Sequence, residues 1–409
     1  MRRLLVLTLL CILSACLKPS DSDMAVSHSL PFQNGDLNNA LSKDSTLKLF
    51  YQAYARLQLS KLLDTTKGYT IFAPVNAAMI AAGLNESTII SLPIDSLNKL
   101  ITPHFVGGAL DDQSFTNSIL SLRAITFRQD TSFSQATGHT VYTAPLFVQE
   151  EANLINFNGF PVTKASPVIP ASNGYIYPIT HVLPGIANQT LADVIASQPD
   201  LSLFKASLEI SDSIRWDYMQ HLYGAYDVNT KDIEWLAQKV PQFYYSGFQP
   251  TILAPTNTAF NKAGFYTADD IRQYALSIPV GYDPGNNLFN YSPIDSITKR
   301  HFIYNLTVAN HTNITTTLIL YSDFLHPQTV NNDVYNVYLG RTTSELYNGL
   351  NLTPALQFSA QQGVAYVKWN DQAAPVLIQQ DKDPAHPVRN FITTFGALYK
   401  VDELFYPNN

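Results

Sequence analysis

One short segment of this chain occurs twice, and this repetition constrains the fold more than any other feature. Residues 69–79 read Tyr-Thr-Ile-Phe-Ala-Pro-Val-Asn-Ala-Ala-Met, and residues 250–260 read Pro-Thr-Ile-Leu-Ala-Pro-Thr-Asn-Thr-Ala-Phe. Three further matches follow in the same order in both halves, and four collinear matches predict two halves built on one plan. The further matches are Pro93–Leu97 with Pro293–Ile297, His104–Val106 with His301–Ile303, and Gly174–Tyr177 with Gly396–Tyr399.

Each copy of the repeated segment predicts a strand that ends at a proline. Residues 70–73 and 251–254 form short apolar runs rich in β-forming residues, as in buried strands. Pro74 and Pro255 follow directly. Because proline has no backbone N–H to donate to a strand ladder, we expect both strands to end there.

A short helix should follow each strand. Asn76 and Asn257 stand where a helix N-cap is wanted, and their side-chain oxygens can accept hydrogen bonds from the next turn. Gly83 and Gly264 come one or two turns later, where a glycine commonly ends a helix. The sequence therefore predicts strand, proline, asparagine cap, short helix and glycine in both copies.

The rest of each half reads as helices first and strands after, which predicts an α+β fold with mostly antiparallel strands. Apolar residues recur at helical spacing in residues 47–62, before the first strand, and in residues 191–195 and 201–210, before the second. The strand-like runs are Ala124–Phe127, His139–Val148, Thr315–Tyr321 and Val334–Leu339, with closing strands at Tyr175–Leu183 and Leu398–Phe405.

The doubled Thr-Ile-Phe/Leu-Ala-Pro-x-Asn-x-Ala-Met/Phe segment resembles the first signature of fasciclin-like (FAS1) domains. His104 and His301 fall where this family has its central histidine segment, and both closing segments resemble its last strand. The resemblance covers residues 36–186 and 187–409. It implies two tandem FAS1-like domains, each a β-sandwich wedge flanked by helices, with an extracellular adhesion or interaction role and no catalysis.

The sequence departs from the family pattern at the central histidines. The family often has tyrosine before this histidine, whereas Pro103 and Arg300 stand there in this chain. Because that Tyr-His pair is tied to integrin-type adhesion in animal relatives, the resemblance does not extend to integrin binding. The closing strands also carry Tyr177 and Tyr399 where the family usually has histidine.

The N-terminus has the pattern of an export signal. Two arginines after Met1 precede an uncharged apolar run from Leu4 to Leu13, and a membrane-spanning helix would need about 20 such residues. The sequence Leu-Ser-Ala-Cys that ends at Cys16 resembles the bacterial lipobox, whose cysteine becomes the first residue and is acylated. We therefore predict a signal peptide over residues 1–15 and lipidation of Cys16.

Cysteine usage favours this anchor. The only cysteines are Cys11, inside the apolar run, and Cys16, so the exported chain has no disulfide framework. A plain secretory peptide with an incidental cysteine is the alternative. Residues 16–35 are polar and predict a flexible tether. With Leu17 after the cysteine, the signal resembles that of an exported outer-membrane lipoprotein, facing either the periplasm or the cell surface.

The sequence lacks catalytic and metal-binding patterns. Its nine histidines show no His-Glu-x-x-His or related ligand spacing, and no nucleophile elbow, Walker loop or dinucleotide loop occurs. We therefore expect no enzyme activity, no metal and no cofactor. The family-motif residues Pro74, Asn76, His104, Pro255, Asn257 and His301 are interpreted as structural, because a repeated histidine beside a strand usually satisfies hydrogen bonds. A hydrolase that depends on His301 is the remaining catalytic alternative.

The second half has grown in two places, before residue 251 and at residues 279–293, and both insertions are rich in aromatic residues. Flat rings in loops give large contact area at low entropy cost, so we interpret them as a binding surface. The alternative is that these rings pack on one another as a local core. The predicted binding residues are Trp216, Tyr218, Tyr223, Trp235, Tyr244, Tyr245, Tyr282 and Tyr291.

Composition agrees with a folded binding protein. Hydrophobic residues make up 46% of the chain and charged residues 14%, which is ample for packed cores. The net charge of −7 and the lack of a basic stripe argue against nucleic-acid binding. The sequence thus predicts a lipid-anchored adhesion or binding protein for an extracellular protein or glycan, of undetermined oligomeric state. The alternative function is an accessory glycan-binding lipoprotein of a polysaccharide uptake system.

Overall fold

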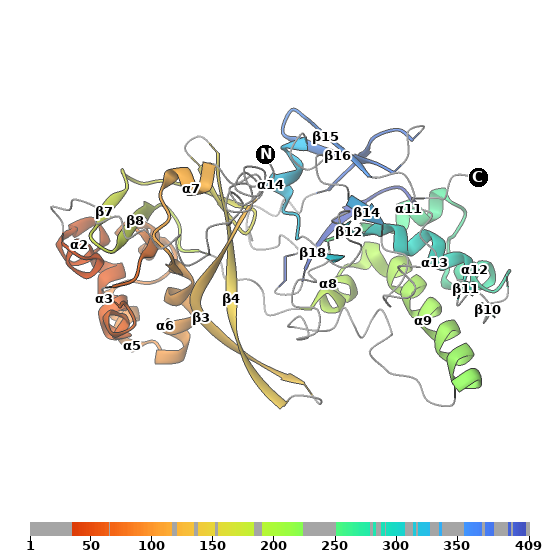
Figure 1. Ribbon diagram of the computed structural model, residues 1–409, viewed down its shortest axis with the longest axis horizontal. Helices are drawn as coiled ribbons and strands as arrows, with labels where there is room; N and C mark the ends of the chain where they lie inside the picture. The colour runs from red at the N-terminus through yellow and green to blue at the C-terminus, as the bar shows by residue number, and fades with distance from the viewer. Residues whose placement is uncertain are drawn as a thin grey trace, which may run out of the picture.

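The computed structural model describes most of the chain from Gly35 onward, and it forms two halves (Figure 1). In each half helices come first and strands follow, which confirms the predicted α+β class. The predicted signal peptide, Cys16 and the predicted boundary at residues 186–187 lie outside the described residues. Those are 35–64, 66–116, 121–134, 138–151, 154–183, 190–223, 251–278, 281–283, 288–290, 292–306, 314–315, 318–327, 335–337, 356–369, 373–379, 392–393 and 396–405.

Most helices of the first half cover one face of its sheet, and the last of them packs against the other core. Phe50 and Tyr54 recur at helical spacing on α3 and stack on Phe105 of the sheet, with ring centroids 5.7 Å apart in both pairs. All three rings are buried. The helices are α2 (Leu37–Lys43), α3 (Lys48–Arg56), α4 (Asn76–Ala81), α5 (Glu86–Ser91), α6 (Ile94–Ile101) and α7 (Asp112–Thr116), with 3-10 turns η2 (Ser45–Leu47), η3 (Leu59–Lys61) and η4 (Thr102–His104).

The strands of the first half form an eight-stranded sheet in the order β6-β5-β4-β3-β2-β1-β8-β7. The end of β6 returns to β8, where Lys164 bridges Ile179, and the sheet thereby encloses a second core around Phe72, Phe157 and Tyr177. The strands are β1 (Tyr69–Pro74), β2 (Phe105–Gly107), β3 (Leu122–Ser134), β4 (Gly138–Glu151), β5 (Leu154–Phe157), β6 (Phe160–Thr163), β7 (Ile169–Ala171) and β8 (Gly174–Ile179).

The second half repeats the central arrangement of the first. Strand β1 pairs antiparallel with β2 and parallel with β8, and β9 pairs in the same way with β12 and β18. Its helices are α8 (Leu191–Ser197), α9 (Ser202–Tyr223), α11 (Asn257–Lys262), α12 (Ala268–Ala275), α13 (Pro293–Thr298) and α14 (Tyr321–Phe324), with turns η5 (Pro199–Leu201) and η8 (Lys299–His301). Its strands are β9 (Thr251–Pro255), β10 (Gly281–Asp283), β11 (Leu288–Asn290), β12 (Phe302–Leu306), β13 (Ile314–Thr315), β14 (Tyr335–Val337), β15 (Gln357–Gln361), β16 (Val364–Lys368), β17 (Val376–Leu377) and β18 (Ala397–Val401).

The strand ends and the helix-ending glycines predicted for both copies are confirmed. Strands β1 and β9 end at Pro74 and Pro255. The short helices α4 and α11 are followed by Gly83 and Gly264, whose φ angles of +75° and +89° lie in the left-handed region that favours glycine. Each copy therefore turns from strand to helix and out again by the same local chemistry.

One strand prediction is wrong. Residues 124–127 and 139–148 lie within β3 and β4, as expected, but the run 315–321 does not form one strand. It ends instead at α14, which begins with Tyr321 because the Asp323 carboxylate accepts the Leu320 N–H at 2.8 Å. Tyr321 and Phe324, three residues apart, then face the core at helical spacing.

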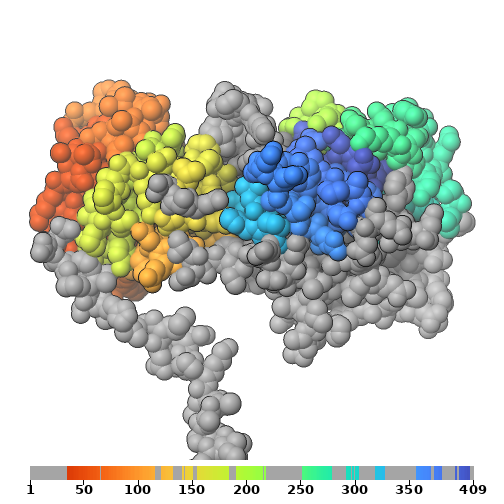
Figure 2. Space-filling view, turned by 90° about the horizontal axis from the view of Figure 1, so that it is seen from above, coloured from red at the N-terminus to blue at the C-terminus, as the bar shows by residue number. Residues whose placement is uncertain are grey.

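The two halves contact each other directly. The carboxylate Oδ1 of Asp323 on α14 accepts the backbone N–H of Ser121 at 2.9 Å and its hydroxyl at 2.8 Å. Phe147 of β4 packs into the apolar cluster of the second half that contains Leu253 and Ile303. The space-filling view shows the yellow strands of the first half against the blue surface of the second (Figure 2).

Candidate functional site

The repeated histidines occupy the same place in both halves. The Nδ1 atom of His104 lies 2.7 Å from the carbonyl oxygen of Phe72, and its Nε2 atom lies 3.2 Å from the Leu183 backbone nitrogen. The Nδ1 atom of His301 lies 2.6 Å from the oxygen of Leu253, and its Nε2 atom 3.2 Å from the nitrogen of Phe405. In each ring Nδ1–H donates to the central strand and Nε2 accepts from the segment after the closing strand.

Burial keeps both rings uncharged. Both histidines are fully buried. Burial lowers the pKa of His104 to about 4, although the hydrogen bond to Phe72 opposes the shift. Burial lowers the pKa of His301 to about 3, with a smaller contribution from the neighbouring Arg300. A neutral ring with both nitrogens bonded to the backbone joins two strands, and it has no nitrogen left to act as a base or a metal ligand.

The asparagines do not cap helices as predicted. Val75 and Thr256 are the N-cap residues, and Asn76 and Asn257 are the first residues inside α4 and α11. Their side chains reach across to the first long helix of each half instead. The Oδ1 atom of Asn76 accepts the N–H of Leu49 at 2.9 Å, and its amide donates to the Ser45 carbonyl at 2.8 Å.

Asn257 repeats these bonds in the second half. Its Oδ1 atom accepts the Leu203 N–H at 3.0 Å, and its amide donates to the Pro199 carbonyl at 3.1 Å. The capping prediction was wrong because position in the chain identifies only nearby partners. The actual partner is an orphan N–H at the start of another helix.

The closing-strand tyrosines also bond alike. The hydroxyl of Tyr177 donates to the Leu110 carbonyl at 3.1 Å, and that of Tyr399 donates to the Ile319 carbonyl at 2.9 Å. Burial raises the pKa of both hydroxyls, so both remain protonated donors. In this chain tyrosine thus performs a structural role at the two positions where the family usually has histidine.

Four of the eight predicted aromatic binding residues lie in described helices and strands. Trp216, Tyr218 and Tyr223 lie on α9, a helix of 22 residues, and not in a loop as predicted. Trp216 is half-buried. Tyr282 lies in β10, paired with Phe289 of β11. The remaining predicted residues, Trp235, Tyr244, Tyr245 and Tyr291, lie outside the described residues.

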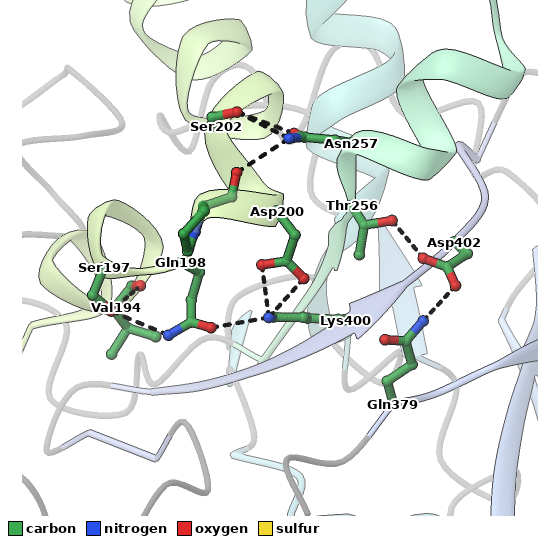
Figure 3. A network of polar contacts seen from close by, with 11 residues as sticks. Val194, Ser197, Gln198, Asp200, Ser202, Thr256, Asn257, Gln379, Lys400 and Asp402 are labelled. Carbon is green, nitrogen blue, oxygen red and sulfur yellow. Dashed lines mark hydrogen bonds and ion pairs between the residues drawn. The ribbon is translucent and has the colours of Figure 1, made fainter.

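The second half carries a polar network at the end of its parallel strands (Figure 3). Lys400 of β18 extends to the turn before α9, where its ammonium lies 2.8 Å from both carboxylate oxygens of Asp200 and 2.9 Å from Oε1 of Gln198. Because β9 and β18 are parallel, their ends lie at one edge of the sheet and bring these side chains together.

A second set of contacts continues the network beyond Lys400. The carboxylate of Asp402 accepts the Thr256 hydroxyl and, at 2.6 Å, the side-chain amide of Gln379. Lys262 lies 2.5 Å from the carboxylate of Glu403 and donates to the Asp402 carbonyl at 2.9 Å. We call Lys262, Lys400 and Glu403 the polar rim. The side chains of Lys262 and Glu403 are half-exposed, so the polar rim can also hydrogen-bond a polar partner.

The first half has a different arrangement at the matching strand. The repeat places Pro178 and Thr180 where the second half has Lys400 and Asp402. The first half instead has ion pairs at Lys164, which follows β6, and its ammonium is 2.5 Å from Glu150 of β4 and 3.1 Å from Asp112 of α7. Burial alone would lower the pKa of Lys164, but the hydrogen bonds to Glu150 and Asp112 raise it.

Sequence reasoning missed the rim of the second half. The match of the closing segments places Pro178 opposite Lys400, so this difference is visible in the sequence. What the match could not supply was the partner, because Asp200 lies 200 residues away in the chain. The contact between Ser121 and Asp323 was missed for the same reason.

The described part of the chain shows neither a metal-binding cluster nor a membrane-spanning helix. Among those residues, no three His, Cys, Asp or Glu side chains gather as a possible metal site. No helix in that part is both long enough and apolar enough to cross a membrane.

Comparison with known proteins identifies the first half. The family model for the Fasciclin domain matches residues 45–184, so this part of the chain carries a FAS1 domain. A FAS1 domain pair from the insect cell adhesion molecule Fasciclin I is similar at 14% identity, with 89% of this chain and 97% of that chain covered and a TM-score of 0.31. No curated protein matches the chain.

Proposed function

We propose that this protein is a lipid-anchored binding protein of a bacterial outer membrane, which holds an extracellular protein or glycan without chemical turnover. The second half is, on this proposal, a further FAS1-type domain. The observation that carries the binding role is the use of the repeated histidines. Both rings are buried, neutral and bonded to backbone at both nitrogens, so the repeated polar positions support the frame and leave recognition to the surface.

The FAS1 domain at residues 45–184 supports this role, because domains of this family occur in adhesion proteins. The polar rim around Lys262, Glu403 and Lys400 adds a hydrogen-bonding surface at a place where the first half has Pro178 and Thr180. A glycan ligand would use such polar groups together with aromatic rings. The alternative function, glycan capture for an uptake system, draws on the same rim and on Trp216 of α9.

The anchor is tested by cysteine exchange. In cells expressing the full chain, Cys16→Ser should abolish fatty-acid labelling and release the protein from membranes, because the acylated sulfur is lost. Cys11→Ser is the matched control, since Cys11 lies in the predicted signal peptide, and it should leave labelling unchanged. Continued labelling of Cys16→Ser would refute the anchor.

The partner class is tested with the purified protein. A glycan screen and a cell-attachment assay should be run on the wild type, on Trp216→Ala and Trp235→Ala, and on Tyr266→Ala as an exposed aromatic control outside the insertions. Sugar binding lost in the tryptophan variants favours glycan capture, and attachment without sugar binding favours adhesion. Turnover of an ester or glycoside by pure protein, lost in His301→Ala, would overturn the non-catalytic proposal.

A further inference from the structure

The two halves differ in what covers one pair of matching helices. The segment Pro-Ile-Asp-Ser opens both α6 and α13. Ile294 of α13 is fully buried, whereas Ile94, at the same place on α6, has 49% of its surface exposed. The same isoleucine is therefore core in one half and surface in the other.

In the second half, the long helix α9 covers this place. Residues after Ile210 continue the helix along α12 and α13, and Figure 1 shows α9 running beyond the length of its counterpart α3. The hydroxyl of Ser211 donates to the buried carboxylate of Asp295 in the first turn of α13. Ile214 packs against the apolar cluster that contains Ile210 and Ile294.

In the first half, the corresponding helix stops short. Helix α3 ends at Arg56, and Gln58 adopts the left-handed conformation with φ of 54°, which turns the chain away. Arg56, which matches Ile210, donates to the carbonyls of Ile89 and Leu92 at the end of α5. In the first half, Arg56 therefore hydrogen-bonds the free carbonyls at the end of α5. The apolar side chains of Ile90 and Ile94 remain exposed to solvent.

These side chains follow one another from the end of α5 into the first turn of α6, and we call them the α5–α6 face: Ile90, Leu92, Pro93, Ile94 and Asp95. Ile90 is 67% exposed and Ile94 49% exposed, while Leu92 is half-buried. At about 100° per residue, Ile94 points to the same side of α6 as the buried Leu97 and Ile101. It is directed as a core residue, yet about half of its surface is exposed, whereas Ile294 is buried in the cluster to which α9 contributes.

We propose that the α5–α6 face binds an amphipathic helix from a partner protein, in the position that α9 takes in the second half. The second half defines the chemistry of the occupant. Two apolar side chains four residues apart, Ile210 and Ile214, pack in and against the cluster that contains Ile294, and a hydroxyl residue between them donates to the aspartate. This proposal does not depend on the lipid anchor or on a glycan ligand.

The probe for this site is a synthetic peptide of residues 207–223, acetylated and amidated, which carries Ser211 and Ile214 of α9. The receptor is the full chain with its isoleucine δ-methyl groups labelled for NMR. The peptide should bind saturably and shift the methyl signals of Ile90 and Ile94, while those of Ile294 and Ile297 stay in place. Shifts at Ile294 would mean that the peptide displaces α9, and they would overturn the proposal.

Matched variants distinguish binding at the α5–α6 face from non-specific binding of the peptide. Ile94→Glu should weaken peptide binding by about ten-fold or more, because it places a charge in the apolar contact. Ile80→Glu, on the exposed side of α4, should change binding by less than about two-fold. A peptide carrying Ile210→Asp and Ile214→Asp should not bind. If Ile94→Glu fails to fold, Ile90→Glu replaces it.

Two outcomes contradict the proposal directly. One is the absence of saturable binding, or equal binding by the wild type and Ile94→Glu. The other is self-association of the chain in sedimentation velocity that Ile94→Glu abolishes, because that would make a second copy the occupant in place of a separate helix.

Discussion

The two halves of this chain share the central strands and the hydrogen bonds around them, which we call the frame. They differ in which helices cover that frame. A histidine bonds to the central strand, an asparagine to the first long helix and a closing-strand tyrosine to a loop carbonyl, and these three hydrogen bonds recur in both halves. Yet Asp95 of α6 is exposed, whereas Asp295 of α13 is buried. The extended helix α9 packs on α13 and not on α6. The comparison teaches that duplication preserved buried polar bonds, while the surfaces around them were free to diverge.

The largest expected effect comes from the shared histidines. His104→Ala and His301→Ala should each lower the free energy of unfolding by about 4 kcal/mol, because each leaves a buried carbonyl and a buried N–H unpaired beside a cavity. Urea unfolding followed by circular dichroism measures this. A loss below about 1 kcal/mol in either half would break the claim of a shared frame.

Acid should destabilise both halves through the same rings. An unfolded histidine has a pKa of about 6.5, and the folded values are about 4 for His104 and about 3 for His301. Within that window the unfolded chain binds a proton that the folded chain does not, so stability falls as the pH drops from 6.5 towards the folded values. At about 1.4 kcal/mol per pKa unit, the loss approaches about 3 kcal/mol for His104 and about 5 kcal/mol for His301.

This pH dependence has a clear control. His104→Gln and His301→Gln remove the titrating group, so the slope of unfolding free energy against pH between 6.5 and 4 should decrease in each. An unchanged slope in both variants would show that other groups dominate the acid response.

The buried isoleucine sharpens the contrast between the covers. Ile294→Ala should lower the free energy of unfolding by about 3 kcal/mol, because its cavity lies in a packed core. Ile94→Ala should cost less than about 1 kcal/mol, because half of this side chain is already in water. Thermal and urea unfolding of the two variants side by side measure the difference, and equal losses would contradict it.

A smaller loss is expected at the asparagines. Asn76→Ala and Asn257→Ala should each cost about 1.5 kcal/mol, because the N–H of Leu49 or Leu203 loses its acceptor at a helix start. Asn257→Asp keeps the acceptor oxygen and should recover part of the loss. No recovery would indicate that the donated bond to Pro199 matters more.

The smallest effect belongs to the rim of the second half. Lys400→Met should cost about 1 kcal/mol, because Asp200 is half-exposed and can turn to water when its partner is removed. The effect should shrink in high salt, where the wild-type ion pair is screened. If the free energy of unfolding fell by several kcal/mol, the polar network would be a major source of stability in the second half, which would contradict this prediction.

Local chemistry explains why part of this structure could be read from the sequence. Pro74 and Pro255 end strands and Gly83 and Gly264 end helices wherever they stand, so their consequences are visible without a partner. Asn76 misled because its partner, Leu49, lies on another helix, and an asparagine beside a helix start is indistinguishable from a cap. The same limit applies to Lys400 and to Ser121, whose partners depend on the packed fold.

The length of α9 also could not be predicted from the sequence. The extra residues before β9 read as an aromatic insertion, and nothing in their spacing distinguishes a continued helix from a loop. Residues 211–223 alternate charged, polar and aromatic residues without a clean stripe. Their helical state depends on packing against α12 and α13, which is a tertiary effect.

The central claim is that matching residues of α6 and α13 differ in exposure although the two halves share one frame. Hydroxyl-radical footprinting of the intact chain, read by mass spectrometry at single residues, tests this claim most directly. The account predicts strong modification of Ile90 and Ile94 and protection of Ile294 and Ile297, at matching places in the two halves. Equal modification of Ile94 and Ile294 would contradict it.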